Sequence, residues 1–70
     1  MIYYKKKDTA ILAGKRKARA YRKDLQLFTV AGEDGYRLAT RQDVKRFKSS
    51  DPSIKVSVVM TFIWWQRGAA

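Results

Sequence analysis

Apolar residues recur along the chain in short runs whose spacing predicts six elements. Runs that alternate or cluster over a few residues are typical of strands, and a repeat near 3.6 residues is typical of a helix. We expect strands at residues 2–4, 25–30, 36–40 and 54–65, and helices at residues 9–23 and 41–48. The predicted order is therefore strand, helix, strand, strand, helix, strand.

The last predicted strand has the clearest alternation. Period two places one set of apolar residues on a single face: Ile54, Val56, Val58, Met60, Phe62 and Trp64. The opposite face begins polar with Lys55 and Ser57 and ends apolar with Val59, Ile63 and Trp65. This change predicts either a central strand or an interface over its C-terminal end. Ile63 and Trp65 are therefore candidate protein contacts.

Turn and capping residues separate the elements. Asp34-Gly35 between two apolar runs predicts a hairpin, because glycine adopts the positive φ that such turns require. Asp8 is the expected N-cap of the first helix, and Thr40 with Asp43 resembles a capping box for the second. Pro52 cannot continue a helix and ends the second one.

These elements predict an α+β fold, a small antiparallel sheet of three to four strands with two helices. The order β-α-β-β-α-β is that of the ferredoxin-like split βαβ fold, in which the first and third strands are central. It resembles the order of RNA-recognition modules, but residues 35–40 lack their aromatic-rich third strand, so we assign no family. We expect one domain over residues 1–70, with residues 1–8 as a basic arm or short strand and residues 66–70 as a frayed tail.

Composition limits the chemistry that the chain can perform. Its 70 residues include no cysteine and no histidine. This excludes disulfides, cysteine-based metal sites and histidine-dependent catalytic triads. The carboxylates are scattered, and those at Glu33 and Asp34 fall on a predicted turn where solvent keeps their pKa values ordinary. We therefore expect a binding protein that is not an enzyme and uses no cofactor or metal.

The positive charge is concentrated near the N-terminus. Sixteen Lys or Arg against six Asp or Glu give a net charge of +10, and residues 1–24 alone carry nine bases and two acids. At 100° per residue, one arc of the first helix collects cations, with Leu12 among them and Lys17 outside. The neighbouring arc collects small and apolar residues: Ala10, Ile11, Gly14, Ala18, Tyr21 and Leu25. The cations of the first arc are Lys15, Arg16, Arg19, Arg22 and Lys23. Because no acid is interleaved, these charges repel one another unless an anion compensates them.

The charge pattern predicts binding to the phosphates of DNA or RNA. The candidate contacts are Lys5, Lys6, Lys7, Lys15, Arg16, Arg19, Arg22, Lys23, Arg37 and Arg41, with Lys45 as a further secondary contact. Tyr3, Tyr4 and Tyr36 could stack on unpaired bases, although we favour core packing of one tyrosine and interfacial placement of another.

An alternative function belongs to a different class. Short, cysteine-free, charged proteins of this kind are expected among phage accessory or anti-defence inhibitors, which bind an acidic surface or the nucleic acid of a host nucleoprotein complex. A homodimer through the last strand is a further expectation. The longest apolar run is too short to cross a bilayer, so we expect no membrane association and a cytoplasmic location, or an intracellular one in a host.

Overall fold

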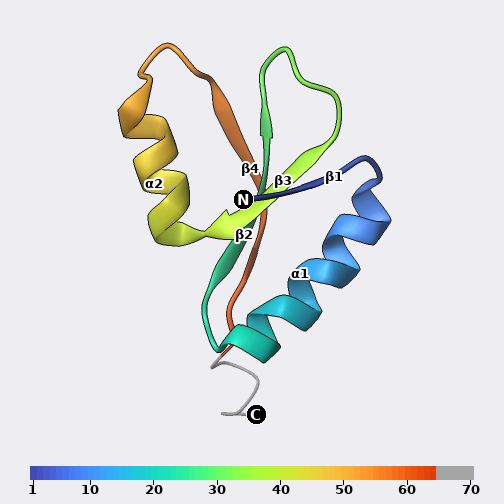
Figure 1. The fold of residues 1–70 in the computed structure, drawn as a ribbon. Helices are drawn as coiled ribbons and strands as arrows, with labels where there is room; N and C mark the ends of the chain where they lie inside the picture. The colour runs from blue at the N-terminus through green and yellow to red at the C-terminus, as the bar shows by residue number, and fades with distance from the viewer. Residues whose placement is uncertain (65–70) are drawn as a thin grey trace.

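A computed structural model describes residues 1–64 of the chain and contains two helices and a four-stranded antiparallel sheet (Figure 1). The elements in chain order are β1 (Ile2–Tyr4), α1 (Lys7–Tyr21), β2 (Leu25–Val30), β3 (Tyr36–Thr40), α2 (Arg41–Ser50) and β4 (Val56–Phe62). The predicted α+β class, with four strands and two helices, is confirmed. The predicted tail at 66–70 lies outside the described residues.

The strands lie in the order β1-β3-β2-β4, so β2 and β3 are the central pair and β1 is at an edge. The expectation that the first and third strands are both central is wrong, and the ferredoxin-like order is not found. Strand length supplies a physical reason. β4 pairs with all six residues of β2, whereas the three-residue β1 offers at most half as long a ladder.

The two helices cover opposite faces of the sheet, α1 on one side and α2 on the other (Figure 1). The alternation of β2 explains this, because Leu25 and Leu27 point to the α1 side while Phe28 and Val30 point to the α2 side. Each face thus has its own small core. Strand β2 is buried on both faces, as its near-continuous apolar sequence requires.

Strand order and helix placement are linked through the handedness of the connections. β1 and β2 run parallel with β3 between them, and β3 and β4 run parallel with β2 between them. The connection from β1 to β2 contains α1, and the connection from β3 to β4 contains α2. Both cross the sheet in the same direction, but they start from β1 and β3, which are antiparallel to each other. Two crossovers of the same hand therefore place their helices on opposite faces, as observed.

A β-bulge at Val59 divides β4 into two segments that face different cores. Leu27 pairs with Met60 but Phe28 pairs with Val58, so Val59 is an extra residue. The bulge reverses the alternation. Val56 packs on the α2 side, while Phe62 packs on the α1 side. The prediction that all even-numbered residues from 54 to 64 share one face is therefore wrong.

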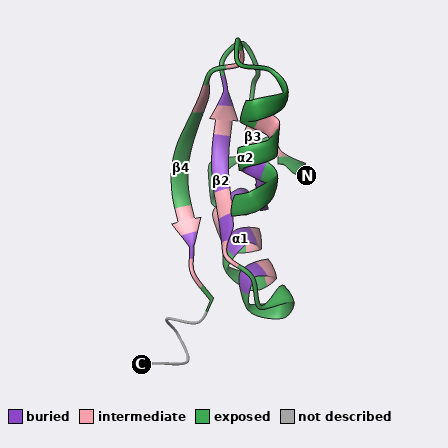
Figure 2. Cartoon of the chain, turned by 90° about the vertical axis from the view of Figure 1, so that its left-hand side faces the viewer, coloured by how far each residue is buried: buried purple, intermediate pink, exposed green. Residues whose placement is uncertain are grey.

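β4 is also an edge strand, not the central strand that we considered from its sequence. Within residues 1–64 it pairs only with β2, and most of its length is exposed (Figure 2). Val58, Val59 and Met60 are 44%, 36% and 37% exposed. The molecule therefore presents an uncharged, apolar strand at one edge.

The turn residues of the hairpin and the capping residue of the second helix were predicted correctly from the local sequence. Both hairpin strands occupy the predicted residues, and Gly35 has a φ of +94°, where a Cβ would lie 2.7 Å from the Tyr4 carbonyl oxygen. The Thr40 hydroxyl accepts a hydrogen bond from the Asp43 N–H at 3.1 Å, as a capping residue should. The α2 helix continues to Ser50, two residues beyond its predicted end.

The predicted bounds of the first helix were displaced at both ends. α1 begins two residues earlier than expected, with Lys6 as its N-cap, so Asp8 lies in the first turn and the predicted cap is wrong. A carboxylate in that turn still interacts favourably with the helix dipole. At the other end, Arg22 adopts a left-handed conformation (φ 54°), which ends the helix two residues before its predicted end.

Candidate nucleic-acid interface

Small residues bring α1 close to the sheet and leave its long basic side chains outside. Ala10, Gly14 and Ala18 are the buried residues of this helix. A Cβ at Gly14 would lie 2.6 Å from Phe62 Cζ, so glycine is needed for the approach to β4. Ile11 of the predicted apolar arc packs on the same core. The arc is wrong at Tyr21, which is 56% exposed, and at Leu25, which lies in β2 beyond the helix.

The solvent side of α1 carries three of the predicted contact residues. Lys15, Arg16 and Arg19 are all exposed. They occupy neighbouring turns of one helix, which is held by its other face on Leu25, Leu27 and Leu38. We call Lys15, Arg16 and Arg19 the α1 basic face.

Further cations lie at both ends of α1. Lys5 and Lys6 lie between β1 and α1, and Lys7 is the first helical residue. Arg22 and Lys23 follow the last helical residue, so they lie outside the predicted helical arc of cations. A helix of 15 residues is about 22 Å long. The exposed cations therefore extend over a distance similar to that of about six phosphates of one duplex strand.

The α1 basic face has no internal neutralisation in the described part of the chain. The ion pairs found among residues 1–64 are Arg37–Glu33 and Arg46–Asp43, and neither involves α1. Lys17 is half-buried, and its Nζ lies 5.5 Å from the centroid of the Tyr21 ring. The face therefore combines high positive charge with side chains that are available to an anion.

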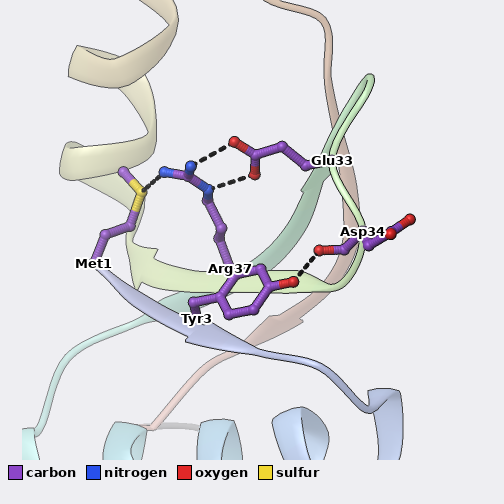
Figure 3. A network of polar contacts seen from close by, with 5 residues as sticks. All are labelled: Met1, Tyr3, Glu33, Asp34 and Arg37. Carbon is purple, nitrogen blue, oxygen red and sulfur yellow. Dashed lines mark hydrogen bonds and ion pairs between the residues drawn. The ribbon is translucent and has the colours of Figure 1, made fainter.

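Arg37 lies on the other side of the sheet, in a network of its own (Figure 3). Its guanidinium donates two hydrogen bonds to the Glu33 carboxylate, at 2.9 and 2.6 Å, and one to Met1 Sδ at 3.5 Å. The hydrogen bonds to Glu33 raise the pKa of Arg37 above its ordinary value; partial burial opposes this, and the Glu33 charge adds to it. Arg37 is thus occupied in joining β3 to the hairpin loop.

Arg41 is also separated from the α1 basic face. It begins α2 and, with Gln26, Gln42 and Lys45, lines an open hollow on the α2 side. The structure therefore divides the predicted contacts into two groups. Those on and beside α1 lie together, while Arg37, Arg41 and Lys45 lie across the sheet from them.

The tyrosines of the first and third strands are also divided between the two faces. Tyr4 and Tyr36 are partly buried against the α1-side core. Tyr3 is 51% exposed on the other face, where its hydroxyl donates to the Asp34 carbonyl oxygen (Figure 3). Neither face thus displays a row of free aromatic rings on these strands.

The C-terminal residues predicted as a protein contact are only partly described. Ile63 is half-buried just beyond β4, and Trp65 lies outside the described residues. The exposed Trp64 (37%) and Tyr21 were not among the predicted site residues. Tyr21 comes directly before Arg22 and Lys23, and an aromatic residue beside two bases is a sequence signal for a binding site. The prediction missed it because the helical projection assigned Tyr21 to the apolar arc.

Metal-ligating clusters and membrane-spanning helices are absent from the described residues. Among residues 1–64, no three His, Cys, Asp or Glu side chains are grouped to hold a metal ion. No helix in that range has the length and apolar character needed to cross a membrane. Comparison with protein-family models, with curated proteins and with solved structures finds no match.

Proposed function

We propose that this protein binds nucleic acid by placing the α1 basic face against the phosphate backbone. The observation that carries the proposal is the absence, within residues 1–64, of any ion pair to Lys15, Arg16 or Arg19 on an exposed helix face. Arginine can bind a phosphate through two parallel hydrogen bonds, and lysine supplies a point charge. Lys5, Lys6, Lys7, Arg22 and Lys23 extend the contact at both ends of the helix.

The binding proposed here depends on the backbone of the nucleic acid. Phosphate contacts position a protein but carry no sequence information by themselves. The α1 basic face has no asparagine or glutamine to read an adenine edge, and we assign its arginines, which can also bind a guanine edge, to phosphates. We therefore expect affinity to depend strongly on salt and weakly on base sequence.

A salt titration tests this function directly. Single-stranded DNA, duplex DNA and RNA of the same length are titrated with the protein, and the change in fluorescence anisotropy is measured at several salt concentrations. Five to six neutralised phosphates give a log–log slope of about −5 on duplex DNA, so affinity falls about 10³-fold between about 50 and about 200 mM salt. Affinity that stays constant over this range would contradict the proposal.

A second candidate is the inhibitor class, in which the cations engage a nucleoprotein complex. The observation in its favour is that exposed cations occupy both sides of the sheet, with Arg41, Lys45 and Lys48 on α2 opposite the α1 basic face. Such a molecule can contact two anionic surfaces at once. Copurification with nuclease treatment separates the candidates: a stoichiometric protein partner that survives digestion supports the inhibitor, and recovered nucleic acid without protein supports the first proposal.

The exposed edge of β4 supports self-association as an additional property. Residues Val56–Phe62 contain no charge, so an acidic partner gains nothing from them, whereas a second β4 offers a matching uncharged strand. Antiparallel pairing about a two-fold axis would extend the sheet and bury Val58 and Met60 of both copies.

Val58→Lys is expected to weaken such a dimer by at least about 10-fold. Val58 is 44% exposed in the monomer, so burying the remainder is worth about 0.7 kcal/mol in each copy, and the substitution also adds two like charges at the seam. Sedimentation equilibrium measures the change. Leu12→Lys is the matched control, because Leu12 is similarly exposed (51%) but lies on α1. A wild-type protein that stays monomeric at high concentration would rule out this dimer.

A further inference from the structure

Two exposed aromatic side chains lie at the end of the molecule where α1 and β4 both finish. Tyr21 is the last residue of α1, and Trp64 lies two residues beyond the end of β4. The pairing of Leu25 with Phe62 brings the start of β2 beside the end of β4. The turn at residues 22–24 is therefore next to the segment that leads to Trp64, and both lie at the lower end of Figure 1.

The exposure of both rings needs an explanation. Tyr21 is 56% exposed and Trp64 is 37% exposed, and within residues 1–64 neither belongs to a core cluster. The polar partner of Tyr21 is Lys17, whose Nζ donates to the tyrosine hydroxyl at 3.5 Å. The same ammonium lies over one face of the ring, 5.5 Å from its centroid, and the residue as a whole remains 56% exposed.

Positive charge surrounds these rings. Arg19, Arg22 and Lys23 are exposed at the same end of the molecule. One acid is also present, Asp24, which is half-buried and has a carboxylate oxygen without a hydrogen-bond partner among residues 1–64. Four nearby bases, including Lys17, outnumber it. An exposed ring among cations is the combination that single-strand-binding proteins use, because the cations hold the backbone while bases stack on the rings.

A duplex cannot use such rings in the same way. Its bases are stacked on one another, so their flat faces are hidden, and only their edges are open in the grooves. Unpaired bases expose their faces and stack on tyrosine or tryptophan with little dependence on sequence. Exposed rings can therefore favour unpaired strands, whereas cations alone release more counterions from a duplex, about 0.9 per phosphate against about 0.7 for a single strand.

We propose that Tyr21 and Trp64 form a stacking site for unpaired bases, which makes single-stranded nucleic acid the preferred ligand of the α1 surface. This inference rests on the proposed function, because the α1 basic face supplies the backbone contacts. Stacking then adds affinity only where bases are free. Unpaired bases of DNA and RNA stack on aromatic rings in the same way. Comparing a single-stranded DNA probe with a single-stranded RNA probe shows which of the two nucleic acids the protein prefers.

The test compares four probes of equal length by fluorescence anisotropy: single-stranded DNA, single-stranded RNA, duplex DNA, and an abasic DNA strand that keeps the phosphates but lacks bases. The intact single strand is expected to bind more tightly than the abasic one. Tyr21→Ala is expected to weaken the intact strand by about 5- to 150-fold, the range for loss of one stacked base, and to leave the abasic strand unchanged. Tyr21→Phe keeps the ring and should retain the affinity.

A matched control removes a similarly exposed tyrosine elsewhere. Tyr3 is 51% exposed on the other face of the sheet, so Tyr3→Ala is expected to leave binding of every probe unchanged. Trp64→Ala should repeat the Tyr21→Ala result, and thermal melting verifies that each variant is folded.

The outcomes separate this inference from the function on which it rests. Equal binding of intact and abasic strands, or no effect of Tyr21→Ala and Trp64→Ala, overturns the stacking site while salt-dependent binding still supports the proposed function. If no probe binds in a salt-dependent manner, both proposals fail. If the rings matter instead for a nuclease-resistant protein partner, the site is a protein contact and the inference is wrong.

Discussion

Replacing Lys15, Arg16 and Arg19 together by glutamine is expected to weaken binding to duplex DNA by about 500-fold at about 0.1 M salt. Each phosphate contact releases about 0.9 counterion from the DNA. Losing one contact therefore lowers the binding affinity about eightfold at this salt concentration. The salt slope should fall from about −5 to about −2 for the same reason. Fluorescence anisotropy over a salt series measures both quantities. Glutamine retains much of the side-chain length and favours a helix nearly as well as lysine and arginine do.

A variant with the same charge change on other elements provides the control. Arg46, Lys48 and Lys55 are exposed, and none of them lies on α1. Their replacement by glutamine also removes three positive charges, and the exposed Arg46–Asp43 pair that is lost contributes little to stability. We expect this variant to keep most of its affinity. Equal losses in the two triple variants would indicate that net charge, and not the α1 basic face, determines binding.

Phe28→Ala is expected to lower the free energy of unfolding by about 3–5 kcal/mol, measured by urea denaturation. Phe28 is fully buried on the α2 side of the sheet, and its ring centroid lies 6.0 Å from that of Phe47. A domain of 70 residues is typically stable by about 4–10 kcal/mol. The substitution therefore removes a large part of the total stability.

Two further variants show whether the loss reflects the two-sided core. Leu27→Ala, on the α1 side of the same strand, should cost about 2–5 kcal/mol. Val59→Ala, at the exposed bulge of β4, should change stability by about 0.5 kcal/mol or less. If Phe28→Ala cost no more than Val59→Ala, helix α2 would not be packed on the sheet as described.

The packing of α1 relates the fold to the proposed function. Because α1 packs on the sheet through alanine and glycine, the helix lies close to the sheet and its long side chains point to solvent. Phe62 fills the space over Gly14, so β4 holds the helix that carries the basic face. We therefore expect binding and stability to be separable, because the cations and the core residues lie on different sides of α1.

Local signals predicted most of the elements, and their limits have clear causes. The hairpin strands and the Thr40 cap depend on neighbours in sequence, so their residues were predictable. The left-handed Arg22 was not, because this conformation is uncommon outside glycine, asparagine and aspartate. The early end of α1 moved Arg22 and Lys23 away from the predicted arc.

The partners of individual side chains also depended on tertiary structure. Arg37 was predicted as a phosphate contact from its charge alone. Its pairing with Glu33 arises because the hairpin loop bends the chain back over β3. Glu33, four residues before Arg37, was a local signal for this pair, but only the turn brings the two side chains together. Arg16 has no acid within four residues and lies on the open side of a helix.

The sequence by itself determined the element order, the hairpin, the concentration of charge in the first third of the chain and the absence of cysteine and histidine chemistry. Each of these follows from composition or from residues a few positions apart. The tertiary structure decided which edge of the sheet β4 occupies, that the two helices cover opposite faces, and which cations share a surface. Strand order depends on the length of competing ladders, and the Val59 bulge reverses a period-two pattern at a single residue. Such effects result from contacts between distant segments, which no local pattern contains.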